Sequence, residues 1–213
     1  MFGLIFPRKC VLCRKLLVKD DLHLCPNCRV EQPEFTHAKR NIPFIAQWTA
    51  LWYYRDSVRT SILRFKFYSS RSYAIRYADL MATRLEHTLE GRYDILSWVP
   101  VSTLRSLRRG YDQSALLAKA LGKRLNTPAK RTLRKVRHTP PQSSIREPAQ
   151  RKANVLGAYR VADPELIGGK RILLIDDVVT TGATASECAK TLLLAGADKV
   201  IFAAIAAADN VKK

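Results

Sequence analysis

No run of apolar residues in this 213-residue sequence approaches the length of a membrane-spanning helix, so we expect no membrane span. The apolar start, residues 1–6, has no basic segment before it, which argues against a signal peptide and for a cytoplasmic protein. The sequence also lacks Gly-x-x-x-x-Gly-Lys-Ser/Thr, the loop that holds the phosphates in many nucleotide hydrolases. That class of nucleotide-binding protein is therefore excluded.

Acidic residues are scarce: 18 Asp and Glu stand against 37 Lys and Arg, which gives a formal net charge of +19. Residues 101–160 hold fifteen of the basic residues and only two acids, Asp112 and Glu147. Polyanions are the natural partners of such a segment, either a pyrophosphate-bearing substrate or a nucleic acid. A solvated basic surface without a ligand remains open as the alternative.

The most informative stretch is residues 172–184. Four consecutive aliphatic residues, Ile172 to Ile175, predict a strand buried on both faces, and a helical pattern follows over residues 183–195. Asp176 and Asp177 are then expected at the carboxyl end of the strand, where open α/β sheets bind ligands. The loop between strand and helix offers backbone amides to a phosphate. An ordinary capped turn would not require a double Asp followed by Thr-Thr-Gly-Ala-Thr.

These thirteen residues resemble the motif that binds phosphoribosyl pyrophosphate (PRPP) in type I phosphoribosyltransferases. The resemblance implies that Asp176 and Asp177 accept hydrogen bonds from the ribose 2′ and 3′ hydroxyls, with Mg²⁺ accompanying the ligand. It also implies a loop around the 5′-phosphate, formed by Thr180, Thr181, Gly182, Ala183 and Thr184. Carboxylates suit a vicinal diol, and a helix N-terminus with threonine hydroxyls suits a dianion.

Two further loops extend this resemblance. The strand expected at 93–99 runs into hydroxyl residues and arginines, and in phosphoribosyltransferases the corresponding loop holds the pyrophosphate; its residues here are Pro100, Val101, Ser102, Thr103 and Arg105. Residues 127–154 show no convincing periodicity, as expected of a functional lid or a disordered loop. They resemble the flexible catalytic loop of the superfamily, which implies roles for Arg137, Gln142 and Arg151.

Two Cys-x-x-Cys pairs, Cys10 with Cys13 and Cys25 with Cys28, lie eleven residues apart near the start of the chain. Four thiolates on two tight turns suit a tetrahedral zinc ion, and in a reducing compartment a metal is favoured over disulfides. A redox pair is the competing interpretation, but it would normally use one such motif beside a βαβ unit. His23 is expected on the surface near the metal, and Cys188 as a buried structural thiol.

Strand and helix patterns alternate along the chain. We expect strands at 48–54, 93–99, 158–162, 172–175 and 199–206, and helices at 58–67, 73–89, 114–125 and 183–195. Residues 31–47 are expected to form a linker. This order predicts an α/β fold with a mostly parallel sheet at residues 35–213, preceded by a zinc-binding module at residues 1–34.

The combination of the cysteine module, Arg-Arg-Gly-Tyr-Asp-Gln at 108–113, Thr-Pro-Pro-Gln-Ser at 139–143 and the PRPP motif resembles the ComF family over essentially the whole chain. These proteins are also described as predicted amidophosphoribosyltransferases and are associated with DNA uptake in naturally competent bacteria. The resemblance implies PRPP, single-stranded DNA and competence machinery as partners. One departure is that Tyr111 and Asp112 stand where the family often has Phe and Asn.

The sequence leaves three functions open. The protein is a phosphoribosyltransferase with an unknown amine or base acceptor, or a scaffold for DNA transport that binds PRPP without turnover, or a nucleic-acid binder that responds to PRPP. The residues expected to contact nucleic acid are Lys130, Arg131, Arg134 and Lys135, which precede the lid and have no evident role at PRPP.

Overall fold

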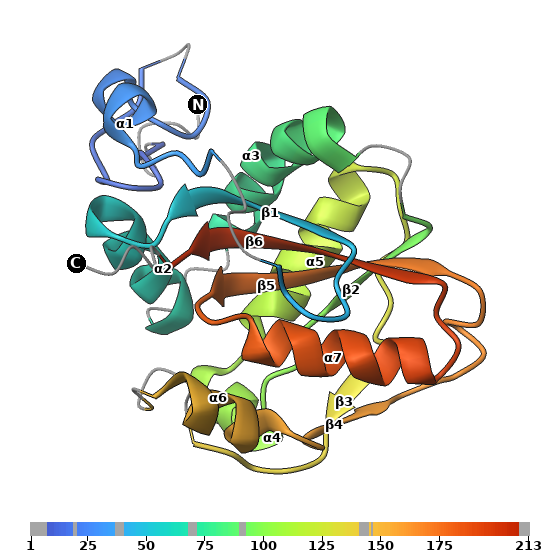
Figure 1. Ribbon diagram of the computed structural model, residues 1–213. Coiled ribbons are helices and arrows are strands. Elements are labelled where there is room, and N and C mark those ends of the chain that lie inside the picture. The colour runs from blue at the N-terminus through green and yellow to red at the C-terminus, as the bar shows by residue number, and fades with distance from the viewer. Residues whose placement is uncertain are drawn as a thin grey trace.

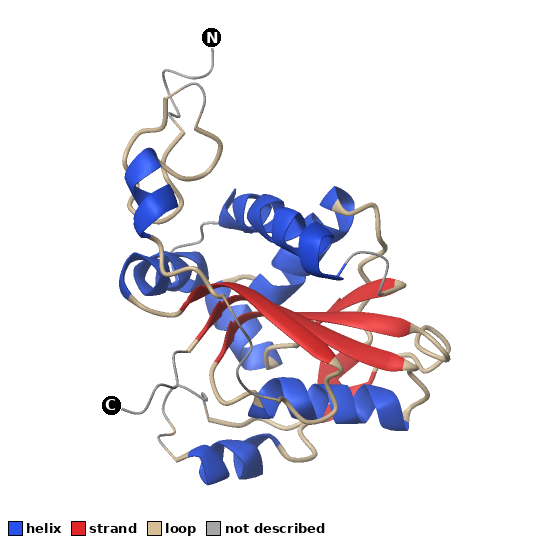
Figure 2. Cartoon of the chain, turned by 45° about the horizontal axis from the view of Figure 1, so that its top comes forward, coloured by secondary structure: helices blue, strands red, loops and turns tan. Residues whose placement is uncertain are grey.

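The computed structural model describes residues 8–18, 21–36, 41–67, 72–89, 93–140, 145 and 147–208, without the side chains of Thr103, Arg105 and Arg108. Its centre is a four-stranded, all-parallel sheet in the order β1-β6-β5-β2, as Figures 1 and 2 show. The strands are β1 (Gln47–Tyr53), β6 (Lys199–Ala207), β5 (Arg171–Val179) and β2 (Ile95–Trp98). The expected α/β fold with a mostly parallel sheet is confirmed.

Two layers of helices cover the sheet, one on each face (Figures 1 and 2). One layer contains α2 (Asp56–Phe67), α3 (Ser72–Leu89) and α5 (Gln113–Arg124), and α7 (Ala183–Leu194) packs on the other face. The central strand β6 sends Ile201, Ala203 and Ile205 into the first layer and Val200, Phe202 and Ala204 into the second. This alternation explains why an unbroken apolar run forms a central strand. None of the described helices is long and apolar enough to cross a membrane.

β5 runs further than the sequence predicted, and both aspartates lie within it. β2 pairs with β5 only as far as Trp98 opposite Ile175, and the Val99 amide then donates to the Ile175 carbonyl. From Asp176 onward β5 is paired with β6 alone among the described residues, with Asp176 opposite Ala204. The chain after β2 thus diverges from β5 where the acidic pair begins, and this divergence opens a pocket.

Several elements were missed in the sequence. Residues 127–154, expected to lack regular structure, contain β3 (Leu133–Lys135) and α6 (Pro148–Val155), and β3 forms an antiparallel pair with β4 (Tyr159–Val161). Two short helices, α1 (Pro26–Glu31) and α4 (Thr103–Arg109), were not expected either. β3 is only three residues long, and α6 buries only Val155, so neither produces a detectable apolar period.

The segment expected as a linker packs against the sheet. Phe35 is buried, its amide donates to the Leu51 carbonyl, and its ring lies 5.1 Å from that of Trp48. Ile42, also buried, lies under Gly182. Only part of this segment, residues 31–36 and 41–46, is described. The first part is hydrogen-bonded to the edge strand β1, and in the second the Ala46 amide donates to the Val200 carbonyl of β6.

The N-terminal cysteine module packs on α2 and α3 and shares their hydrophobic core. The Ser61 hydroxyl and the Arg64 guanidinium of α2 donate to the carbonyls of Val11 and Leu12, which lie between the first two cysteines. His23 Nε2 lies 3.0 Å from Asp79 Oδ2 of α3. The division into units at residues 1–34 and 35–213 stays a prediction, but the contact between the two parts is extensive.

Candidate functional site

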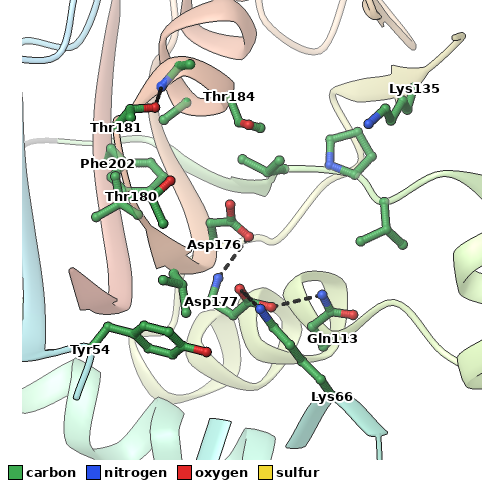
Figure 3. A pocket seen from close by; sticks show the side chains of 18 of the residues that line it. Tyr54, Lys66, Gln113, Lys135, Asp176, Asp177, Thr180, Thr181, Thr184 and Phe202 are labelled. Atoms are coloured by element: carbon green, nitrogen blue, oxygen red, sulfur yellow. Dashed lines mark hydrogen bonds and ion pairs between the residues drawn. The ribbon is translucent and has the colours of Figure 1, made fainter. Parts of the chain in front are cut away.

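A pocket of about 580 Å³ lies at the carboxyl ends of β2 and β5 (Figure 3). Its walls come from several places in the chain: the residue after β1, the end of α2, the chain after β2, the joint between α4 and α5, the β3–β4 pair, the segment from β5 into α7, and β6. The lining includes the acidic pair and every residue of the expected phosphate loop. The lining residues used below are Tyr54, Lys66, Phe67, Pro100, Val101, Arg109, Gln113, Lys135, Asp176, Asp177, Thr180, Thr181, Gly182, Ala183 and Thr184.

The two aspartates have different surroundings. Asp176 Oδ1 accepts from the Ser114 hydroxyl at 2.9 Å and from the Asp177 amide at 2.8 Å. Asp177 is buried, and its two oxygens contact Gln113 Nε2 at 2.9 Å and Lys66 Nζ at 2.8 Å (Figure 3). The carboxylates are therefore oriented by hydrogen bonds from α5 and neutralised in part by a cation from α2.

Burial, and after it the neighbouring charge of Asp177, raises the pKa of Asp176 from its ordinary value of 3.8 to about 7. Two adjacent carboxylates at a buried strand position disfavour double ionisation, because each charge repels the other. Lys66 and the hydrogen bond from Ser114 reduce this effect but do not cancel it. The pair therefore stores repulsion that a ligand or a cation can relieve, which is typical of a functional site.

This repulsion predicts a pH dependence of stability. Because the pKa of Asp176 is raised in the folded state, the folded protein keeps a proton that the unfolded chain releases, so the free energy of unfolding falls as pH rises from about 4 to about 7. We expect Asp176→Asn to be more stable than the wild type above pH 7, on the order of 1–3 kcal/mol, with the difference vanishing near pH 4. Urea unfolding of both proteins between pH 4 and 8 measures this, and parallel curves would rule the repulsion out.

The expected phosphate loop lies at one wall of the pocket, where β5 passes into α7. Gly182 precedes the first residue of α7 and has a φ of +82°, and a Cβ at this position would lie 2.9 Å from Ile42 Cγ1. Both facts require glycine here. The Thr181 hydroxyl accepts from the Ala183 amide at 3.4 Å. The loop thus turns tightly and presents the start of a helix to the pocket, as an anion site requires.

The expected pyrophosphate loop lines the pocket only in part. Pro100 and Val101 are lining residues, whereas Ser102 is not. Ser102 precedes α4, and its hydroxyl is buried without a hydrogen-bond partner among the described residues. The side chains of Thr103 and Arg105 lie outside the described part of the structure. A buried unpaired hydroxyl next to a helix start is available to a ligand oxygen.

Tyr111 and Asp112, which depart from the family pattern, hold the walls of the pocket together. Asp112 Oδ1 accepts from the Ala115 amide at 3.0 Å and caps α5, while its Oδ2 accepts from the Val101 amide at 3.3 Å. The Tyr111 hydroxyl donates to the Phe65 carbonyl in α2. These contacts fix the chain after β2 and the end of α2 relative to α5.

Three cations line the pocket: Lys66, Arg109 and Lys135. Arg109 donates to Gln113 Oε1 at 2.9 Å, and its guanidinium lies 4.9 Å from the ring centre of Phe67. Lys135 donates to the Thr139 hydroxyl at 2.8 Å. Sequence reasoning gave Lys66 and Arg109 no role, and only the fold brings them to the acidic pair. The pocket therefore combines two carboxylates with cations that suit a polyanionic ligand.

Of the expected lid residues, Arg137 and Arg151 are not among those that line the pocket. Arg137 is exposed and donates to the Asn154 carbonyl at 3.1 Å, and Arg151 Nε donates to the Ile145 carbonyl at 2.8 Å. Gln142 lies outside the described residues. Asn154 Nδ2 in turn donates to the Pro140 carbonyl at 3.2 Å. The described parts of residues 137–154 are thus linked to α6, at the rim of the β3–β4 pair.

The four residues expected to contact nucleic acid separate into two groups. Lys130, Arg131 and Arg134 are exposed. Lys135 instead lines the pocket, a position that the sequence did not predict. The reason is the alternation along β3, which turns Leu133 and Lys135 inward and Arg134 outward.

The four N-terminal cysteines converge as a metal site requires. Their Sγ atoms all lie within 4.8 Å of one another, and those of Cys13 and Cys25 are 3.6 Å apart. Zinc–sulfur bonds of about 2.3 Å in a tetrahedron place sulfurs about 3.8 Å apart, so the donor set fits a zinc ion in both chemistry and spacing. His23 is not part of this cluster, and Cys188 is buried in α7.

The fold and these two sites define a class: an α/β protein with a pocket lined by carboxylates and cations at the carboxyl edge of a parallel sheet, and with a four-cysteine cluster that fits a metal ion. Over 219 residues the chain is 27% identical to Competence protein F of Haemophilus influenzae, covering 92% of this chain and 95% of that protein. It is 26% identical over 200 residues to Competence protein ComFC of Bacillus subtilis, which covers 88% of this chain and 78% of that protein. The resemblance to the ComF family is confirmed, and it extends over about nine tenths of the chain.

Other similarities cover less of the chain. DNA utilization protein YhgH of Salmonella typhi is 38% identical over 103 residues, which are 48% of this chain and 44% of that protein. A solved glutamine PRPP amidotransferase from Bacillus subtilis matches with a TM-score of 0.44 and 19% identity, over 66% of this chain and 30% of that one. A solved adenine phosphoribosyltransferase matches with a TM-score of 0.41 and 12% identity, over 64% of this chain and 73% of that one. No family model matches the chain.

Proposed function

We propose that this chain is a cytoplasmic, ComF-type protein that binds PRPP with Mg²⁺ in the pocket and acts in the handling of imported DNA. The observation that carries the proposal is the composition of a single pocket: a carboxylate pair on β5, a tight helix-start loop after it, and, among the described residues, three cations in the same lining. A ribose with a 5′-phosphate and a diphosphate needs these three kinds of partner.

The residues present fit the groups of PRPP. Asp176 and Asp177 would accept from the ribose hydroxyls, the loop from Thr180 to Thr184 would hold the 5′-phosphate, and Pro100 to Arg105 would lie along the diphosphate. Pro100 and Val101 of this loop line the pocket, which supports its part in holding the diphosphate. Mg²⁺ prefers hard oxygen ligands and would supply charge neutralisation between the diphosphate and ribose oxygens.

Two versions of this function share the same pocket. In a transferase, an acceptor attacks ribose C1 as pyrophosphate leaves, and the pocket acts by positioning and by stabilising charge on the leaving group. In a sensor, PRPP binds without turnover and changes the affinity for another partner. Release of pyrophosphate in the presence of amine and nucleobase acceptors separates the two.

Thermal unfolding tests binding at once for both versions. A ligand that binds only the folded protein raises its melting temperature with concentration. Mg-PRPP is therefore expected to raise it more than equal concentrations of Mg-pyrophosphate or ribose 5-phosphate, each of which fills only part of the pocket. Equal melting temperatures with and without Mg-PRPP would contradict the assignment of the pocket.

Binding of single-stranded DNA is a second candidate function, favoured by one feature of the β3–β4 pair. Arg134 and Arg160 lie directly opposite each other across the two strands, and both are exposed. Like charges directly opposite on one face of a sheet are destabilising, and a bound polyanion removes that penalty. Lys130 and Arg131 lie just before β3 and extend the same basic surface. DNA is the occupant that the names Competence protein F and DNA utilization protein YhgH suggest.

Neutralising this surface should weaken DNA binding without changing PRPP binding. We expect K130Q/R131Q/R134Q to lower the affinity for a single-stranded oligonucleotide. The variant should also reduce the slope of log affinity against log salt concentration, by about 0.7 for each phosphate that it no longer neutralises. Fluorescence anisotropy at salt concentrations between about 50 and 200 mM gives both the affinity and its dependence on salt.

The control for this variant is R59Q/K170Q/K199Q, which removes the same charge from exposed residues outside the β3–β4 pair. It should change DNA affinity far less. Equal losses in the two triple variants would assign the binding to net charge alone, and no salt-dependent binding by the wild type would exclude the function.

A further inference from the structure

A lysine from the last turn of α2, Lys66, lies in the pocket, although α2 is not part of the PRPP motif. Lys66 Nζ lies 2.8 Å from Asp177 Oδ1, and the lysine side chain is 19% exposed (Figure 3). The other oxygen of Asp177 is bound by Gln113. Both oxygens of this carboxylate are thus engaged within the protein.

The backbone that carries Lys66 is fixed on several sides. The Ser61 hydroxyl, one turn and a half earlier, contacts Val11 of the cysteine module and lies 2.6 Å from the Tyr77 hydroxyl of α3. Arg64 donates to the Leu12 carbonyl, and the Phe65 carbonyl accepts from Tyr111. With the helix held in this way, the flexible four-carbon side chain of Lys66 is the part that can change partner.

A ligand whose hydroxyls donate to Asp177 competes with Lys66 for the same carboxylate oxygens. The displaced ammonium group then lies in a pocket of about 580 Å³ with the ligand itself. An ammonium group carries three donors and no acceptor, so it needs an anionic or carbonyl oxygen in place of Asp177. A diphosphate on C1 of the ribose supplies such oxygens near Asp177. Ribose 5-phosphate has anionic oxygens only on its 5-phosphate, which the proposal places at the loop from Thr180 to Thr184.

We propose that Lys66 is a specificity-determining residue of the pocket, one that exchanges Asp177 for the diphosphate of the bound ligand and so selects PRPP over ribose 5-phosphate. This inference rests on the proposed binding of PRPP. It assigns to α2 a direct part in the site, in addition to the strand, loop and helix of the motif. The rival explanation is that Lys66 only balances the charge of Asp177.

The two explanations differ in the ratio of two affinities. If Lys66 contacts the diphosphate, Lys66→Gln lowers the affinity for Mg-PRPP at least about tenfold, the loss of one charge-assisted hydrogen bond. The affinity for ribose 5-phosphate should not fall, because this ligand gives the displaced ammonium group of Lys66 no new partner. Lys66→Arg, which keeps the charge, retains most of the preference for PRPP. Arg59→Gln removes the same charge from an exposed position of α2 and should change neither affinity. Calorimetric titration with each ligand gives all of these values.

A measurement on the wild type does not depend on how the variants fold. Acetylation of lysine amines, mapped by mass spectrometry, should slow at Lys66 in the presence of Mg-PRPP and should not slow with ribose 5-phosphate. Equal changes for the two ligands, in the affinities of Lys66→Gln or in this labelling, would overturn the role of Lys66 while leaving PRPP binding intact. A wild type that binds neither ligand would instead overturn the proposed function and this role with it.

Discussion

Replacing Cys25 by serine is expected to release the metal ion and to unfold the N-terminal module. The cluster offers four sulfur donors, and loss of one leaves a tetrahedral site incomplete. Structural zinc contributes on the order of 10 kcal/mol to the folding of small zinc modules, more than the few buried residues of this module can replace. Elemental analysis of purified protein should find one zinc per chain in the wild type and far less in the variant.

The effect of this substitution should reach the pocket. Val11 and Leu12, between two of the metal ligands, are bound by Ser61 and Arg64 of α2, the helix that carries Lys66. We therefore expect a severalfold loss of PRPP affinity together with the metal. Cys188→Ala is the matched control, because Cys188 is buried in α7 outside the cluster and should not affect the metal content. Undiminished zinc in Cys25→Ser would show that these cysteines do not hold the metal.

The double variant D176N/D177N is expected to lose PRPP binding by at least about a hundredfold, since two charge-assisted hydrogen bonds from the ribose hydroxyls are weakened together. Asparagine keeps the shape of each side chain. Alanine in place of Asp177 would leave Gln113 and Lys66 without their partner in a buried setting. Asparagine can still accept from Gln113 and Ser114, so the fold should persist.

Calorimetric titration with Mg-PRPP measures the loss, and circular dichroism checks that the variant is folded. E165Q/D198N removes the same charge from two exposed loop carboxylates and should bind PRPP as the wild type does. A folded D176N/D177N protein with unchanged affinity would mean that the acidic pair serves the structure and not a ligand.

The parts of the site that are contiguous in sequence could be predicted. A buried aliphatic run followed by two aspartates and Thr-Thr-Gly specifies a strand, a tight turn and a helix through local interactions, and β5 and α7 follow this pattern. The convergence of Cys10, Cys13, Cys25 and Cys28 was also predictable, because two tight turns with thiol pairs have few other uses.

The contributions from distant elements could not be predicted. Lys66 precedes Asp177 by more than a hundred residues, and only the placement of the end of α2 at the carboxyl end of β5 brings the two together. A basic residue in the last turn of an amphipathic helix is ordinary, so the sequence marks Lys66 in no way. The position of Lys135 in the pocket was not predicted, because its strand of three residues is too short for the alternation to be recognised.

Isothermal titration of the wild-type protein with Mg-PRPP tests the central claim most directly. We expect saturable binding of one PRPP per chain that needs Mg²⁺, and that strengthens between pH 6 and 8 as Asp176, whose pKa is raised to about 7, loses its proton and becomes a better acceptor for the ribose hydroxyls. Absence of heat and of any change in melting temperature at millimolar Mg-PRPP would contradict the claim that this pocket binds PRPP.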